Sequence, residues 1–346
     1  MNGHGTTLRG QDPIPAPAAG GVSRSEAAGR AYAIRPYGLE AYRGVAALLI
    51  VVYHAYQHSR LTSAYVYEGT PLHVLLRNLE AGVAWFFVLS GFLIVLPFAH
   101  AAVDRQSALS ARGFLARRAI RIVPLYYVAI LTVWALRYTG GVGQWRDLLE
   151  HLTFTPIFDQ THIFWTLGPA WSLAVEALFY LVVAVAGPLA VRACGRLDTS
   201  RARMAFLGGG AVALGIASVA YKWWAVAVAH IPAQNYPTYF GLLAKLDTFA
   251  LGMLLAVAVV AAGSGPILGG IAPTLLRLAG GALLAMTFVL RTTSTPVDLY
   301  FHTLSGVAFA LVLASTVLGP RGAVWERLLA AAPSPGADLV QPLPVA

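Results

Sequence analysis

The 346-residue sequence predicts an all-α fold, a polytopic transmembrane helical bundle of about eight helices. Hydrophobic residues make up 58% of the chain and charged residues only 11%, against about 25% charged residues in ordinary soluble domains. A water-soluble fold cannot bury that much apolar surface, so lipid must be part of the solvent.

The second observation is a series of apolar runs, each long enough to cross about 30 Å of hydrocarbon at about 1.5 Å per residue. The expected helices span residues 41–58, 80–99, 119–138, 167–190, 204–229, 239–262, 268–290 and 298–319. Residues 1–37 are expected to form a disordered cytoplasmic tail, residues 38–320 the transmembrane domain and residues 321–346 an irregular C-terminal tail.

The basic residues predict the orientation of the bundle. Sixteen of the 24 Lys and Arg residues fall in the N-terminal tail, in the connections after the second and fourth helices, or near the end of the chain. Seven fall on the opposite side, and Arg277 lies near or within the seventh helix. This bias predicts a cytoplasmic N-terminus for a multi-pass protein, which we expect in the inner (plasma) membrane. The membrane orientation therefore accounts for the net charge of +9, and no nucleic-acid partner is expected.

Two further features concern cysteine and the longest connection. The lone cysteine, Cys194, excludes intrachain disulfides and cysteine-rich metal sites, and no metal is expected. The connection at about 139–166 is polar and is expected on the outer side. It either meets a polar substrate or is a plain solvated loop.

Arg43 and His54 are the first candidates for chemistry, because ionisable groups inside a bilayer are costly and mark function. They lie eleven residues apart on one expected helix, about three turns, so they share a face about 16 Å apart along the axis. A histidine can act as a general base near neutral pH. The alternative for His54 is a hydrogen-bonded core histidine.

Other ionisable side chains lie in or beside the expected helices. Glu176 lies early in the fourth helix with Ser172 one turn before it, and either serves the site or forms a structural ion pair. Arg117, Arg118 and Arg121 open the third helix, where they suit a polyphosphate ligand or simply set the topology. Asp247 is a further acid near an outer boundary, with a local pair to Lys245 as its alternative role.

Four ordered segments resemble one family. Arg43 is followed by Gly44 and, after ten residues, by His54; the other three segments are Phe86 to Leu93, Arg117 to Tyr126, and Trp171 to Glu176. Together they are similar to the motifs of the integral-membrane acyltransferase 3 family, bacterial-type enzymes that O-acylate carbohydrates. The stretch from Lys245 to Leu255 resembles a weaker family segment.

The resemblance implies an acyltransferase, for groups other than aminoacyl groups, that moves an acyl group from cytoplasmic acyl-CoA, with acetyl-CoA favoured, to a hydroxyl of a cell-surface or lipid-linked carbohydrate. His54, Arg43 and Glu176 would be catalytic. Arg117, Arg118, Arg121 and Tyr126 would bind the acyl-CoA. Ser90, Trp171, Ser172 and Asp247 would bind substrate. A direct transfer and an acyl-histidine route remain equally open.

The chain departs from the family near its end, because family members have about ten helices and this sequence provides about eight. After Trp325 a proline-rich stretch follows, so we expect a shortened bundle. A transporter or flippase of acyl or lipid-linked sugar groups, or an inactive family member, are the alternative functions. The halves of the sequence show no convincing repeat, which disfavours the transporter.

Overall fold

The computed structural model describes residues 36–59, 64–107, 109–137, 142–263, 265–291 and 298–320. The chain divides into two compact units, Met1–Pro36 and Tyr37–Ala346, and the fold described below is that of the second. The expected tail over 1–37, apart from the first residues of a helix, and the expected tail over 321–346 lie outside the described residues.

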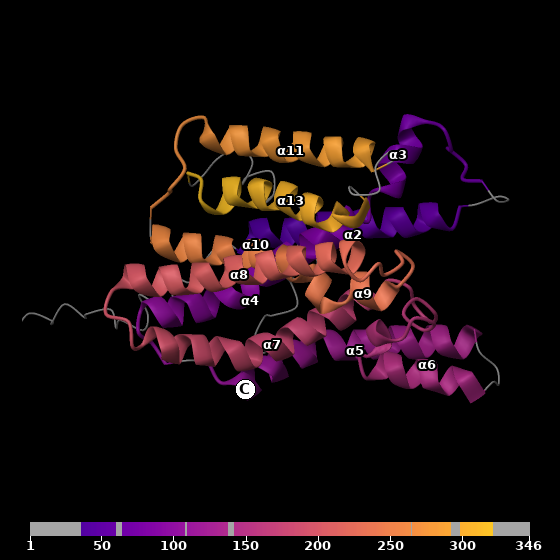
Figure 1. Cartoon of the computed structure of the whole chain (residues 1–346), viewed down its shortest axis with the longest axis horizontal. Coiled ribbons are helices and arrows are strands. Elements are labelled where there is room, and N and C mark those ends of the chain that lie inside the picture. Colours follow the sequence, from indigo (N-terminus) through magenta and orange to yellow (C-terminus); the bar gives the residue numbers. More distant parts are fainter. Residues whose placement is uncertain are drawn as a thin grey trace, which may run out of the picture. The chain divides into compact units, whose positions relative to one another are not determined.

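All eight expected helices are present, which confirms the predicted fold class (Figure 1). They are α2 (Pro36–Gln57), α4 (Ala81–Val103), α5 (Ala111–Arg137), α7 (Ala170–Cys194), α8 (Ser200–Ala227), α10 (Leu242–Ala262), α11 (Ala272–Leu290) and α13 (Phe301–Val317). Short elements lie between them: α3 (Pro71–Arg77), α6 (Val142–Leu152), the 3₁₀ turn η1 (Pro156–Phe158) and α9 (Tyr236–Phe240). The described part of the chain contains no strand.

Six helical segments in the described ranges are long and apolar enough to cross a membrane: α4 together with α3, α5, α7, α8, α10 together with α9, and α11. Helix α13 is apolar but has only 17 residues. Helix α2 mixes its apolar stretch with Glu40, Arg43 and His54. The protein is therefore a multi-pass membrane protein.

Helix α4 lies at the centre of the bundle and contacts α7, α10 and α13. In its segment, 83% of the most apolar window is buried, whereas the corresponding share is 11% in both α5 and α8. Glycines allow α4 and α10 to touch: a Cβ at Gly91 would lie 2.1 Å from the Phe249 carbonyl oxygen, and one at Gly252 only 2.0 Å from that of Val88. Small residues permit this close backbone approach between membrane helices.

Hydrogen bonds between connections define two ends of the bundle. At one end, Arg105 after α4 donates to the carbonyl oxygens of Leu197 and Asp198 after α7, at 3.2 and 3.3 Å. Helices α5 and α8 begin at this end, which we call the arginine end. At the other end, the loop end, Gln160 after α6 donates to the Gln234 carbonyl oxygen at 2.6 Å and accepts from the Tyr236 amide.

The expected connection at 139–166 contains an amphipathic helix, α6, which hydropathy alone does not reveal because its sequence alternates apolar and charged residues. Helix α5 holds the backbone of α6: Tyr126 donates to the His151 carbonyl oxygen at 2.9 Å and Tyr127 to that of Leu152 at 2.8 Å. Trp145 stays exposed. This connection is thus a folded segment that packs on α5 at the loop end.

Helix α5 begins earlier than predicted, at Ala111 instead of residue 119. The Ser110 hydroxyl accepts from the Gly113 amide at 3.1 Å, and this satisfies one of the free amides of the first turn. The early start places Arg117 and Arg118 well inside the helix.

Candidate active site

Helix α2 carries Arg43 in its first half, about level with Trp85 of α4, and His54 near its C-terminus. Tyr42 fixes the helix, because its hydroxyl lies 2.7 Å from the Thr316 hydroxyl of α13 and its ring lies 5.4 Å from that of Trp85. Arg43 is half-buried and lies 3.4 Å from the exposed Glu40 carboxylate. His54 is half-buried toward the loop end, with its Nδ1 3.1 Å from the Gln57 amide oxygen.

The central polar group joins α4, α5 and α7. Glu176 Oε1 accepts hydrogen bonds from the Ser90 hydroxyl and from the Tyr180 hydroxyl, the latter at 2.5 Å. The Arg118 guanidinium lies 5.7 Å from the centre of the Tyr180 ring, over its face. The charges of Arg43 and Glu176 both act on Arg118, so α2 contributes to the same polar region.

The three arginines of α5 divide into two sets. Arg118 points into the bundle, where it also lies over the Phe114 ring at 5.9 Å, while Arg117 and Arg121 are exposed at the arginine end. Arg118 is therefore the member that contacts the central group. The two exposed arginines remain available to a ligand that enters from this end.

Tyr126 lies about two turns of α5 beyond Arg118, or about 12 Å along the axis. Its hydroxyl is occupied by the His151 backbone, and its ring stacks on Phe154 at 4.4 Å. None of the described contacts joins Tyr126 to the arginines, so its place in donor binding stays a prediction.

At the loop end, Trp171 and Ser172 open α7. Trp171 is buried against Phe240, whose ring centre is 4.7 Å away, whereas the Ser172 hydroxyl donates to the Pro169 carbonyl oxygen at 3.0 Å. Ser172 and Glu176 share a face of α7, as expected, but their side chains have separate partners.

Asp247 pairs with a different lysine from the one the sequence suggests. Lys222 Nζ of α8 lies 2.6 Å from Asp247 Oδ2, and the Thr303 hydroxyl of α13 bonds to the same oxygen. The local pair with Lys245 is wrong, because side chains two positions apart on a helix point in different directions. Lys222 and Lys245, which the charge count assigned to the outer side, are both buried within helices.

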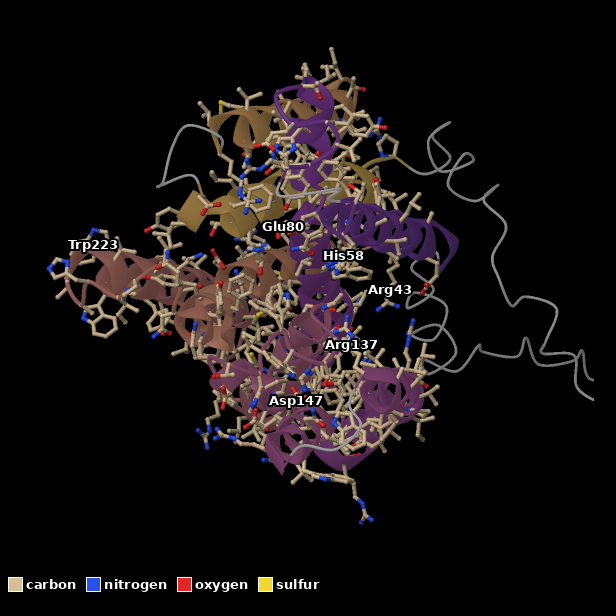
Figure 2. The ribbon with its side chains drawn as sticks, turned by 90° about the vertical axis from the view of Figure 1, so that its right-hand side faces the viewer. Arg43, His58, Glu80, Arg137, Asp147 and Trp223 are labelled. Atoms are coloured by element: carbon tan, nitrogen blue, oxygen red, sulfur yellow. The ribbon has the colours of Figure 1, made fainter. Side chains whose placement is uncertain are left out.

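A second ion pair stands close to His54. Glu80, at the N-terminus of α4, lies 2.5 Å from Arg291 Nη1 and accepts a hydrogen bond from Tyr53, the neighbour of His54. The Glu80 charge also acts on His54. Figure 2 views the loop end, with Glu80 near the middle of the described side chains and Trp223 of α8 at the edge. None of the described contacts joins Glu176 to His54. Glu80, in contrast, interacts with Tyr53, the residue before His54.

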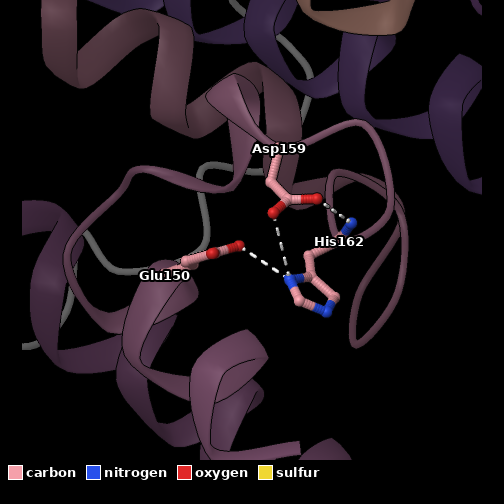
Figure 3. Close-up of side chains that lie close together, drawn as sticks. All are labelled: Glu150, Asp159 and His162. Carbon is pink, nitrogen blue, oxygen red and sulfur yellow. Dashed lines mark hydrogen bonds and ion pairs between the residues drawn. The ribbon is translucent and has the colours of Figure 1, made fainter. Parts of the chain in front are cut away.

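The polar residues of the α6 region form two groups. Asp147 and His151 are fully buried, with His151 Nδ1 3.2 Å from Asp147 Oδ1. Glu150, Asp159 and His162 cluster at the surface (Figure 3), where His162 Nδ1 lies 2.9 Å from Glu150 Oε2. These three side chains are close enough to share a cation. However, Arg146 forms ion pairs with both carboxylates, so each already has a cationic partner within the protein.

Sequence reasoning missed Tyr180, Glu80, Lys222, Arg291 and His302 as polar groups of the interior. Tyr180 follows Glu176 by four residues and shares its helix face, which was a usable signal. A lysine within the expected helix at 204–229 was another. Glu80, Arg291 and His302 fall at helix ends, where sequence alone does not distinguish solvent from interior.

One comparison with known proteins identifies the family. A family model described as an acyltransferase domain matches residues 37–334. The curated proteins and the solved structures give no match to this chain. The matched range contains each of the four segments whose order resembles the family's motifs, and it covers most of the chain. The protein therefore belongs to the acyltransferase 3 family and is a multi-pass membrane acyltransferase.

Proposed function

We propose that the protein transfers an acyl group, with acetyl favoured, from cytoplasmic acyl-CoA to a hydroxyl of a cell-surface or lipid-linked carbohydrate. The observation that carries this proposal is the arrangement along α2. Arg43 lies within the electrostatic reach of the Arg118 group, while His54 lies toward the loop end beside Glu80. One helix thus connects the cationic region around Arg118 with a candidate base near the loop end.

The donor would enter at the arginine end. Arg117 and Arg121 are exposed there and suit phosphate groups, which guanidinium binds through paired hydrogen bonds. Arg118 and Arg43 continue the positive region toward the interior. This entry requires the arginine end, and with it the N-terminus, to face the cytoplasm of the inner membrane, as the excess of basic residues supports.

His54 would take the proton from the acceptor hydroxyl as its oxygen attacks the thioester carbonyl carbon. When the carbon–sulfur bond breaks, His54 would return that proton to the CoA thiolate, so the protein ends in its starting state. Arg43 would hold the donor end of the path. Glu176, fixed by Ser90 and Tyr180, would balance the charge of Arg118. Ser172, Trp171 and Asp247 would line the approach of the acceptor from the loop end.

The test follows release of free CoA from acetyl-CoA by purified protein in nanodiscs, with and without mixed cell-surface glycans. We expect His54→Ala to lower glycan-dependent release by at least about 100-fold, as removal of a general base does. Arg43→Ala should lower it as well, chiefly through the acetyl-CoA dependence.

Two matched controls separate these effects from general damage. His58→Ala removes an exposed histidine one turn from His54, and Arg112→Ala removes an exposed arginine at the start of α5. Both should retain release close to that of the unmodified protein. If the folded, unmodified protein neither binds acetyl-CoA nor releases CoA, the donor assignment fails, and transport of intact acyl groups becomes the function to test.

A further inference from the structure

Lys245 of α10 is a buried cation whose neighbouring carboxylates already have other partners. Its side chain is 94% buried, since only 6% of the residue's surface is exposed. Its Nζ lies 5.0 Å from the centre of the Phe240 ring and 5.7 Å from that of Trp171, over their faces. Ring faces compensate only part of the cost of burying an ammonium group.

The nearest acid, Asp247, has both of its oxygens in use. Oδ2 receives Lys222 and Thr303, and Oδ1 accepts the Thr248 amide at 2.9 Å. Glu80, the other carboxylate whose charge acts on Lys245, is paired with Arg291. Among the described residues, no ion pair or hydrogen bond of the Lys245 ammonium is found.

His302 of α13 carries an unsatisfied polar atom close to Lys245. Its Nδ1 is buried without a hydrogen-bond partner in the described structure. The ring contacts the same two aromatics as Lys245, with its centre 6.1 Å from Trp171 and 6.5 Å from Phe240. A neutral imidazole can donate a hydrogen bond from one ring nitrogen, so Nδ1 can serve an oxygen acceptor. Buried polar groups without partners are rare and point to a ligand that is not present.

We propose that Lys245 and His302 together bind a carboxylate or phosphate group carried by the acyl acceptor. An oxyanion between them would pair the buried ammonium and accept a hydrogen bond from the imidazole. The site adjoins the Glu80–Arg291 ion pair, because the Phe301 ring lies 5.5 Å from that of His302 and 3.9 Å from the Arg291 guanidinium. This inference rests on the proposed function for its acceptor and adds that the acceptor is anionic.

The experiment measures binding directly, by calorimetry on the protein in phosphatidylcholine nanodiscs without acyl-CoA. The probes are methyl β-glucuronide, its neutral match methyl β-glucoside, and inorganic phosphate. We expect the glucuronide or the phosphate to bind about tenfold or more tightly than the glucoside, as for one charged hydrogen bond. Binding of glucuronide alone indicates an acidic sugar, and binding of phosphate indicates a phosphorylated acceptor.

Variants locate the preference. Lys245→Met should abolish it and Lys245→Arg should retain it, while Arg137→Met, which removes an exposed cation at the same end, should leave it unchanged. Equal binding of the charged and neutral probes to the unmodified protein overturns the proposal. This outcome does not depend on whether Lys245→Met folds. A preference that survives in folded Lys245→Met overturns it too. Because calorimetry needs no acyl-CoA, either result leaves the CoA-release test of the proposed function independent.

Discussion

Arg291 Nη1 lies 2.5 Å from Glu80 Oε1, and this ion pair joins the C-terminus of α11 to the N-terminus of α4. Arg291 also contacts Asp298 at 2.6 Å and the Asn78 side-chain oxygen at 3.2 Å, and its guanidinium lies 3.9 Å from the centre of the Phe301 ring. Glu80 continues the connection to Tyr53 on α2. Four helices thus meet at one pair beside His54.

Arg291→Met should therefore destabilise the bundle by about 3 kcal/mol, because it leaves the largely buried Glu80 carboxylate without its cation. The measurement is denaturant unfolding in detergent, followed by tryptophan fluorescence. Arg196→Met, at an exposed position of the arginine end, should change the free energy of unfolding by less than about 0.5 kcal/mol. Equal effects of the two substitutions would show that the Glu80 pair contributes nothing specific.

Ser90→Ala and Tyr180→Phe should each lower glycan-dependent CoA release by about tenfold, since each removes one hydrogen bond to the Glu176 carboxylate. The double variant should lose less than the product of the two losses, because both donors hold the same oxygen atom. Rates and folding are compared with those of Thr153→Ala, whose exposed hydroxyl bonds to the backbone of its own turn. Strictly multiplicative losses would mean that the two hydroxyls do not act through Glu176.

Gly252→Ala should destabilise the bundle by about 3 kcal/mol or more, because the added methyl would lie 2.0 Å from the Val88 carbonyl oxygen of α4. Gly209→Ala is the matched control on α8, where nothing lies within 4 Å. That substitution should stabilise by up to about 1 kcal/mol, since alanine favours a helix over glycine. The thermal unfolding midpoint, measured for each variant in the same detergent, should fall for Gly252→Ala and rise for Gly209→Ala.

Acid should loosen the surface cluster of the α6 region through Asp159. Burial raises the pKa of Asp159, but the Thr161 and His162 amides and the His162 and Arg146 charges outweigh it, so the pKa lies below the ordinary 3.8. Its contribution to stability is present above that ordinary value and is lost as pH falls through the lowered pKa. The protection of the amides of residues 156–166, corrected for the intrinsic exchange rate at each pH, should be lower at pH 3 than at pH 5 in the unmodified protein. The same comparison on Asp159→Asn should show a smaller change, and an equal change would assign the effect to another group.

Hydropathy predicted the eight helices because each must bury backbone polar groups inside lipid, which leaves a long apolar run in the sequence. It missed α6, which lies at the polar loop end and whose Asp147 and His151 are buried by packing on α5 and not by their own character. The sequence indicated that Glu176 needs a partner, yet its partners Ser90 and Tyr180 depend on how α4 meets α7. Partners that lie on separate helices follow from packing, which a single sequence does not specify.

The enclosed helix α4 also fixes a length. Glu80 precedes Ser90 by ten residues of one straight element, about 15 Å along its axis, and neighbouring helices cover most of its surface. Such an element can neither stretch nor slide without opening its contacts with α7, α10 and α13. It therefore keeps a constant distance between the Arg118 region and the His54 region. A donor held by the arginines must carry its reactive carbon across that span on its own flexible arm.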